Sequence, residues 1–293
     1  MTRVSPLLLA FVLLGVSACS AQARDCEGTL DVLEERFEVR PGGSVDLELD
    51  AGGLEVVRGS GNHVVVRAER CADSRDALAR HHFTASRSGN DVSVVSQRDE
   101  GRARSWFGRG RDELRVVLKV TVPTEYGIRF SSGAGDVTLA DITGPVRGQT
   151  GAGNLTLTSV RGSVDVTTGS GNVLFERVLG QVNVQTGAGN VELLDVEGGL
   201  RVQTGAGNIS AEIARQPKAH TELNTGAGNV TVHLSPNVRV EVQAVASVGG
   251  ASTDFPLKVE GSWMTKSFAG NINGGGPRLE MRSGVGNVSL KRR

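Results

Sequence analysis

A five-residue phrase, Thr-Gly-Ala-Gly-Asn, recurs along this chain at a step of 18 residues. The copy at Thr168 has Ser170 in place of alanine, and the outermost copies are variants of the phrase. A fixed period of this length is typical of solenoids, in which each repeat forms one coil that stacks on the last. The copies start at Ser132, Thr150, Thr168, Thr186, Thr204, Thr225 and Ser283.

Within each repeat, apolar and polar residues alternate in two short runs, and each run opens with glycine. The repeat from Gly180 to Glu197 shows this alternation in both halves. Alternation with a period of two in short β-branched runs predicts strands, and glycine supplies the positive φ angles of tight corners. We therefore predict an all-β, single-chain β-solenoid with 18-residue coils and two short strands in each coil.

Adding 18 to a residue number gives the residue expected to lie directly above it in the stack. Four such columns are apolar throughout and should form the core: Val146, Val164, Val182, Leu200; Leu155, Val173, Val191, Ile209; Leu157, Phe175, Leu193, Ala211; and Ile142, Val160, Val178, Val196. The asparagine column is expected to form a ladder of amides along one corner: Asn154, Asn172, Asn190, Asn208 and Asn229.

On either side of the regular repeats the pattern becomes irregular, as is common at the ends of solenoids. One short helix is expected within 72–83, capped by Asp73 or Ser74, and an insertion at 216–218 lengthens one step to 21 residues. The predicted segments are a signal peptide (1–18), a tether (19–36), degenerate coils with an Arg-rich loop at 98–112 (37–122), regular repeats (123–234) and irregular closing coils (235–293).

The N-terminus reads as an export signal, because Arg3 precedes an apolar run that is too short for an ordinary membrane span. Val16-Ser17-Ala18-Cys19 resembles the lipobox of bacterial lipoproteins, which implies that Cys19 is the lipidated first residue of the mature chain. The alternative is ordinary secretion with cleavage after Ala23. Ser20 resembles a signal for sorting to the outer membrane. The expected localisation is therefore export and lipid anchoring, at the outer membrane.

The chain has three cysteines, and export would place them in an oxidising compartment. Cys26 and Cys71 can then form a disulfide, and lipidation accounts for Cys19, which is left over. The charges balance, with 32 Lys and Arg against 32 Asp and Glu, so electrostatics give no reason to expect a nucleic-acid partner.

Enzymatic chemistry has weak support in the sequence. Glu176 and Glu212 share a column with Leu194 between them, which would separate the carboxylates by about 9.6 Å, near the range of an inverting glycosidase. The intervening leucine favours a solvated face, so we predict no catalytic residues and no cofactor.

Asparagine at the corners, in place of aspartate, argues against calcium, and we predict no metal. His81 and His82 are interpreted as surface residues at a helix end.

The segment from Arg98 to Asp112 is the best candidate for contact with a partner. It is rich in arginine and glycine and has two adjacent aromatic residues at its centre. These could touch a membrane surface, an anionic glycan or a protein, and the alternative is a connector whose aromatics fold back over the open solenoid end. The candidate contact residues are Arg104, Trp106, Phe107 and Arg109.

Several motifs in a fixed order resemble a family of adhesin-like domains, a group of bacterial envelope proteins of unknown function. The resemblance covers nearly all of 37–291 and brings no catalytic residues with it. The family label implies adhesion at the cell surface. Together with the lipobox-like segment, it leads us to predict a non-catalytic envelope lipoprotein that acts as an adhesin-like binding or structural module. The alternatives are a carbohydrate-active enzyme and an envelope-sensing accessory protein that docks a membrane partner. The matching motifs are Phe37-Glu38-Val39, Pro41-Gly42-Gly43, Val120-Thr121-Val122-Pro123, the Gly-Asp/Asn-Val corners, Asp254-Phe255-Pro256 and Gly270-Asn271-Ile272-Asn273-Gly274-Gly275.

Overall fold

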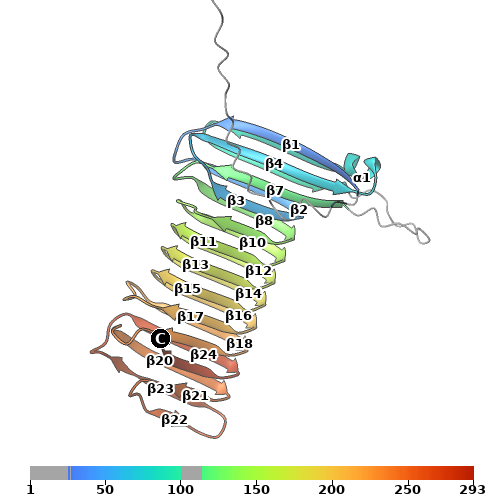
Figure 1. The fold of residues 1–293 in the computed structure, drawn as a ribbon. Coiled ribbons are helices and arrows are strands. Elements are labelled where there is room, and N and C mark those ends of the chain that lie inside the picture. Colours follow the sequence, from blue (N-terminus) through green and yellow to red (C-terminus); the bar gives the residue numbers. More distant parts are fainter. Residues whose placement is uncertain (1–25, 27, 100–113) are drawn as a thin grey trace, which may run out of the picture.

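The computed structural model describes residues 26, 28–99 and 114–293, and it shows an elongated stack of coils built from two facing sheets (Figure 1). We call the end that holds the first strands the proximal end and the opposite end the distal end. From proximal to distal, sheet A contains β1 (Thr29–Glu38), β4 (His63–Ala72), β7 (Leu114–Val122), β3 (Gly53–Arg58), β9 (Val137–Ala140), β11 (Leu155–Arg161), β13 (Val173–Leu179), β15 (Val191–Glu197), β17 (Ile209–Ile213), β19 (Val230–Leu234), β25 (Val288–Arg292) and β21 (Ala251–Thr253).

Sheet B faces sheet A across the core, and each regular coil contributes one strand to each sheet. Its order from proximal to distal is β5 (His81–Ser88), β6 (Asp91–Arg98), β2 (Ser44–Ala51), β8 (Gly127–Ala134), β10 (Val146–Ala152), β12 (Val164–Ser170), β14 (Val182–Ala188), β16 (Leu200–Ala206), β18 (Thr221–Ala227), β24 (Arg278–Val285), β20 (Val240–Val248), β23 (Lys266–Ile272) and β22 (Val259–Gly261).

The central coils pair in parallel with the predicted step of 18 residues, which confirms the solenoid. Val182 lies in register between Val164 and Leu200, and all three side chains are buried. The other predicted core columns are buried as well, except that Val196 is only half-buried. The step from β16 to β18 is 21 residues, as the insertion at 216–218 predicted.

The corner phrase is held by hydrogen bonds from one coil to the next. The backbone N–H of Asn190 donates to the side-chain oxygen of Asn172, and the N–H of Asn208 donates to that of Asn190. This confirms the predicted amide ladder, which begins at Asp136 and continues to Asn287. Gly189 has a φ of 142°, and a Cβ there would overlap the carbonyl oxygen of Gly171, so the corner requires glycine.

The proximal end differs from the sequence prediction. Part of the predicted tether, 19–36, is strand: β1 starts at Thr29 and pairs antiparallel with β4, which pairs antiparallel with β7. The charged residues of β1 hid its alternation, but Leu33 and Phe37 pack against the end of the core. Strands β5 and β6 are also antiparallel, so residues 37–122 combine true coils with a closing layer of hairpins.

The predicted helix is present but short. Helix α1 covers Arg75–Ala79 and lies near the proximal edge of sheet A (Figure 1). Ser74 caps it by accepting a hydrogen bond from the N–H of Ala77, as one of the two predicted caps. No helix in the part of the chain described here has the length and apolar character needed to cross a membrane.

The distal end closes in an order that the repeat pattern did not reveal. Strands β24 and β25, near the C-terminus, insert next to β18 and β19, ahead of the earlier strands β20 and β21. The final Ser-Gly-Val-Gly-Asn phrase therefore forms a regular coil, and the segment 240–272 lies beyond it as the true end (Figure 1). The thirteen described strands of sheet B, at about 4.8 Å each, separate the two ends by roughly 60 Å.

Candidate functional site

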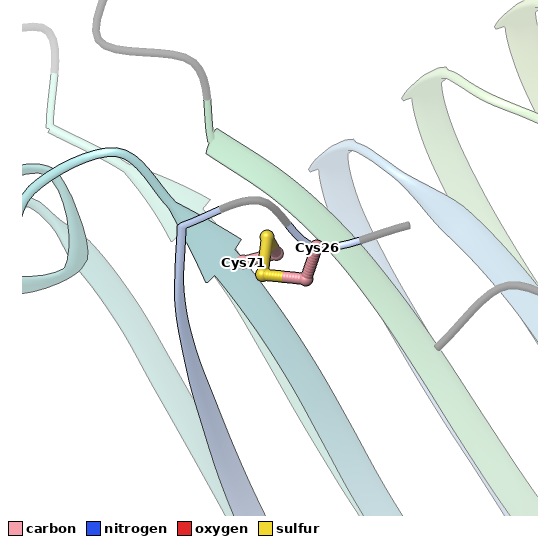
Figure 2. The surroundings of a disulfide bond; sticks show 2 residues. All are labelled: Cys26 and Cys71. Carbon is pink, nitrogen blue, oxygen red and sulfur yellow. A yellow bond between two sulfur atoms is a disulfide. The ribbon is translucent and has the colours of Figure 1, made fainter. Parts of the chain in front are cut away.

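The proximal end contains the one pair of predicted site residues that the structure describes. Cys26 forms a disulfide with Cys71 of β4, with their Cα atoms 5.8 Å apart (Figure 2). Cys71 lies opposite Leu30 of β1 and opposite Arg115 of β7, so the disulfide attaches the start of the described chain to the first layer of sheet A. The predicted lipidation and contact residues lie outside the described residues: Cys19, Arg104, Trp106, Phe107 and Arg109.

A cavity of about 490 Å³ opens at the proximal end, between the corner at Gly52–Gly53 and the start of β7. Gly53 lines it at the position where the regular coils carry the asparagine of the ladder. Its polar lining is already engaged, since a carboxylate oxygen of Asp50 accepts the backbone N–H of Arg98 at 2.9 Å. Asp136, the first member of the ladder, lies on its distal side and accepts hydrogen bonds from Asn154.

His81 lies in the wall of this cavity, and here the sequence interpretation was wrong. We expected a surface residue at a helix end, but His81 is the first residue of β5 and is only 6% exposed. Its Nε2 lies 2.9 Å from the hydroxyl of Ser96, and Arg70 donates to its carbonyl oxygen. Burial, with the positive charges of Arg70 and Arg98 nearby, lowers the pKa of His81 to about 4, so the ring is neutral at pH 7.

His82 is exposed, as predicted, and lies 2.9 Å from the carboxylate of Asp99. Within the described ranges, no three His, Cys, Asp or Glu side chains gather in a way that could hold a metal ion.

The two carboxylates considered for glycoside hydrolysis stand apart on the outer face of sheet A. Glu176 pairs in register with Leu194, so the leucine does separate it from Glu212. Each carboxylate forms an ion pair, Glu176 with Arg177 and Glu212 with Arg293. Both pairs are partly exposed to solvent, so the arrangement resembles a solvated sheet face more than a pair of catalytic acids.

The distal end carries a surface that sequence reasoning missed. Trp263 is 88% exposed and sits in the turn between β22 and β23, with Met264 beside it. Val248 and Val285 pair in register at the adjoining corner and are 43% and 58% exposed. The backbone N–H of Gly249 donates to the carbonyl of Met264 at 3.2 Å, which holds the turn against that corner. We call Val248, Trp263, Met264 and Val285 the distal patch.

A sequence signal for the distal patch was present. The alanine position of the corner phrase becomes valine at Val285, and Trp263, earlier in the chain, lies in a short segment between two lysines. The corner position is exposed in every coil, so a larger apolar residue there adds apolar surface.

The match to a family model covers most of this architecture. Residues 46–291 match the family described as Toastrack DUF4097, from β2 to β25. The chain belongs to the Toastrack family. This confirms the predicted kind of family, and the match includes the distal patch and the wall of the proximal cavity.

Solved structures similar to this Toastrack chain include two described as putative adhesins. The one from Bacteroides fragilis is 11% identical, with 89% of this chain and 97% of that chain covered and a TM-score of 0.46. The one from Parabacteroides distasonis is 10% identical, with coverages of 92% and 98% and a TM-score of 0.46. A putative lipid binding protein from the same species is 11% identical, with coverages of 90% and 97% and a TM-score of 0.29. Among curated proteins, none matches this chain.

Proposed function

We propose that this Toastrack chain is a non-catalytic, lipid-anchored module of the bacterial cell envelope, with an adhesin-like binding role. The proposal combines the export signal and lipobox-like sequence before Cys19 with the two ends of the solenoid. One end is attached through a disulfide to the chain that leads back to Cys19, and the other end exposes an apolar patch.

The observation that carries the proposal is the placement of the disulfide. Cys26 is seven residues after Cys19, so the chain between them can span at most about 25 Å when fully extended. Because Cys26 is bonded to Cys71 in the proximal layer, a lipid on Cys19 would hold that end close to the membrane. The distal patch, roughly 60 Å away along the strand stack, would be free to reach a partner.

The central coils suit a rigid spacer between these ends. Each coil is hydrogen-bonded to both neighbours through two strands and the amide ladder, and a single apolar core runs through the stack. The proposal keeps a second contact with a partner, formed by Arg104, Trp106, Phe107 and Arg109. Their segment is flanked by Arg98 and Leu114, and both of these flanking residues lie at the proximal end. The outer membrane is the proposed location, on the evidence of Ser20.

The test is the chemistry of the mature N-terminus. Protein expressed from the full gene in a bacterial host should begin at Cys19 and carry acyl chains, as shown by mass spectrometry of its N-terminal peptide. Cys19→Ala should lose the acyl chains and the membrane fractionation that depends on them. Cys71→Ser is the matched control, because it removes a different cysteine and should leave lipidation intact. A wild-type N-terminus without lipid, or one cleaved after Ala23, would overturn the anchor.

A further inference from the structure

The turn that carries Trp263 is held rigidly although its side chain is exposed. The N–H of Thr265 donates to the hydroxyl of Ser262, and the hydroxyl of Thr265 donates to the carbonyl of Ser247 in β20. A third bond joins Gly249 to Met264. These three hydrogen bonds hold the backbone of the turn against the neighbouring strand, so little backbone entropy would be lost when the indole meets a partner.

The charge of the distal end differs from that of the rest of the chain. Residues 235–293 contain eight Lys and Arg against four Asp and Glu, whereas the whole chain is neutral. Lys258 and Lys266 flank the turn of Trp263 in sequence, and Lys266 begins the strand that follows it. Glu260 is the one acidic residue between them, and its pair with Lys258 is exposed, so it binds that lysine only weakly.

We propose that the distal patch binds the surface of an anionic lipid bilayer, with Trp263 and Met264 at the interface and Lys258 and Lys266 at the headgroups. The inference rests on the proposed function as an envelope contact module and names the partner. An exposed indole beside long cationic side chains suits the boundary between acyl chains and headgroups. Charge complementarity favours anionic lipid, because basic residues near such a surface strengthen binding.

The size of the patch argues against a second copy of this chain as the occupant. A stable protein interface buries about 800 Å² on each partner and draws on roughly twenty residues. The distal patch consists of four side chains, and the edge strands beside it, β21 and β22, are each three residues long. Such short edges also offer little for pairing with another sheet.

The chain offers a clean spectroscopic test, because its two tryptophans are Trp106 and Trp263. In Trp106→Phe, the fluorescence reports on Trp263 alone. A lipid on Cys19 would hold Trp263 roughly 60 Å from the vesicle that it enters, so the test uses the acyl-free variant Cys19→Ala with Trp106→Phe. Mixing this protein with phosphatidylglycerol-rich vesicles that carry brominated acyl chains should shift the emission to the blue and quench it. Vesicles of brominated phosphatidylcholine should quench it several-fold less. Lys258→Gln and Lys266→Gln should each weaken anionic-vesicle binding by about fivefold.

Matched controls keep this test specific. Leu179 is 39% exposed and Met264 is 41% exposed, so Met264→Ser should reduce quenching whereas Leu179→Ser should not. Lys218→Gln, at an exposed lysine in the insertion between β17 and β18, should leave anionic-vesicle binding unchanged.

Flotation of the lipidated protein with phosphatidylcholine vesicles reports on the anchor independently of Trp263. If the lipidated protein floats, and anionic vesicles neither shift nor quench Trp263 in the acyl-free protein, the patch proposal is wrong and the anchor stands. If the protein carries no lipid but Trp263 is quenched by an excess of anionic vesicles, the anchor is wrong and the patch proposal stands. Equal quenching by both lipids, or a blue shift that grows with protein concentration without lipid, would overturn the patch proposal, the latter in favour of a second copy.

Discussion

The central coils and the two ends solve the same packing problem in different ways. Between β8 and β19 every strand has a parallel neighbour on both sides, and core residues repeat in register. At the proximal end, antiparallel strands, a one-turn helix and a disulfide cover the core, and at the distal end strands are reordered to close it. Repeated coils can lengthen the stack but cannot end it. The outermost coil has no neighbour on one side, so other elements must cover the core there.

This difference also separates structural residues from candidate functional ones. In the described chain, the perturbed histidine, the cavity, the disulfide and the exposed tryptophan all belong to the ends. The central coils present mostly polar, solvated faces and the amide ladder. Substitutions in the centre should therefore act on the stability of the stack, and substitutions at the ends should act locally or on binding.

The largest effect is expected from a charge in the central core. Val182→Asp would bury a carboxylate with no partner, which costs several kcal/mol in desolvation, and damage should spread to the adjoining coils because repeats share their interfaces. Gln185→Asp on the same strand points outward and should change the melting temperature little. Asn183→Asp is a poorer control, because the Asn183 side-chain amide donates to Asp165. Equal losses for Val182→Asp and Gln185→Asp in thermal melts would show that the alternation was assigned to the wrong face.

Two glycines with a positive φ, one in a central corner and one in a proximal turn, should differ because only the first is crowded by a neighbouring coil. Gly189→Ala forces a Cβ onto the backbone of the preceding coil, so its cost should exceed the 1–3 kcal/mol of a strained backbone alone. Gly42 also has a positive φ, 85°, but a Cβ there would have open space around it. Gly42→Ala should therefore cost about 1–2 kcal/mol, from strain only. Urea titrations of the two variants measure the difference, and similar losses would contradict the close approach of the coils.

Removal of the disulfide should loosen the proximal end and spare the centre. The bond closes a separation of 45 residues, for which a loss of about 2–4 kcal/mol is typical. In Cys71→Ser, hydrogen exchange should accelerate in β1 and β4, with β12 and β14 unchanged. Free-thiol labelling of unfolded, unreduced wild-type protein should find neither Cys26 nor Cys71 reactive. Acceleration throughout the stack would mean that the two regions unfold as one unit.

The sequence predicted the periodic part of the fold well, because each inward column repeats one chemical character with an 18-residue step. Val164, Val182 and Leu200 could be aligned by arithmetic alone. The ends could not be predicted in this way. The last copy of the corner phrase lies in β24 and marks it as part of a coil, but the phrase does not show that this coil precedes β20 in space. The charges of β1 concealed its apolar inner face.

For the candidate sites, too, the sequence predicted what depends on few residues and missed what depends on contacts outside the repeat. Cysteine counting predicted the disulfide, which depends on just two residues and the compartment. His81 and Trp263 were missed because their environments depend on non-repeating contacts: the hydroxyl of Ser96 and Arg70 for one, and the corner at Gly249 for the other. Local sequence carries no record of such contacts.

The last predicted effect belongs to His81, and it is absent at neutral pH and appears only in acid. Its pKa falls from 6.5 to about 4 on folding, chiefly through burial and then through Arg70, Arg98 and His82, while Asp50 opposes the shift. Above pH 6.5 the ring is neutral in both the folded and the unfolded chain, so its ionisation does not affect the free energy of unfolding. Between pH 6.5 and 4 the unfolded chain binds a proton that the native ring does not, so stability falls as the pH falls. At pH 4.5 the loss should reach roughly 2 to 3 kcal/mol, since each unit of pKa shift corresponds to about 1.4 kcal/mol.

His81→Gln can keep a hydrogen bond to Ser96 and has no proton to gain, so it isolates this contribution from the carboxylates that also titrate in acid. Urea titrations at pH 7 and pH 4.5 should show that wild type loses roughly 2 to 3 kcal/mol more than the variant. Parallel losses in the two proteins would mean that His81 is solvated in solution. A larger loss in the variant would mean that protonated His81 gains a partner in acid and stabilises the proximal end, the reverse of the burial that the structure shows.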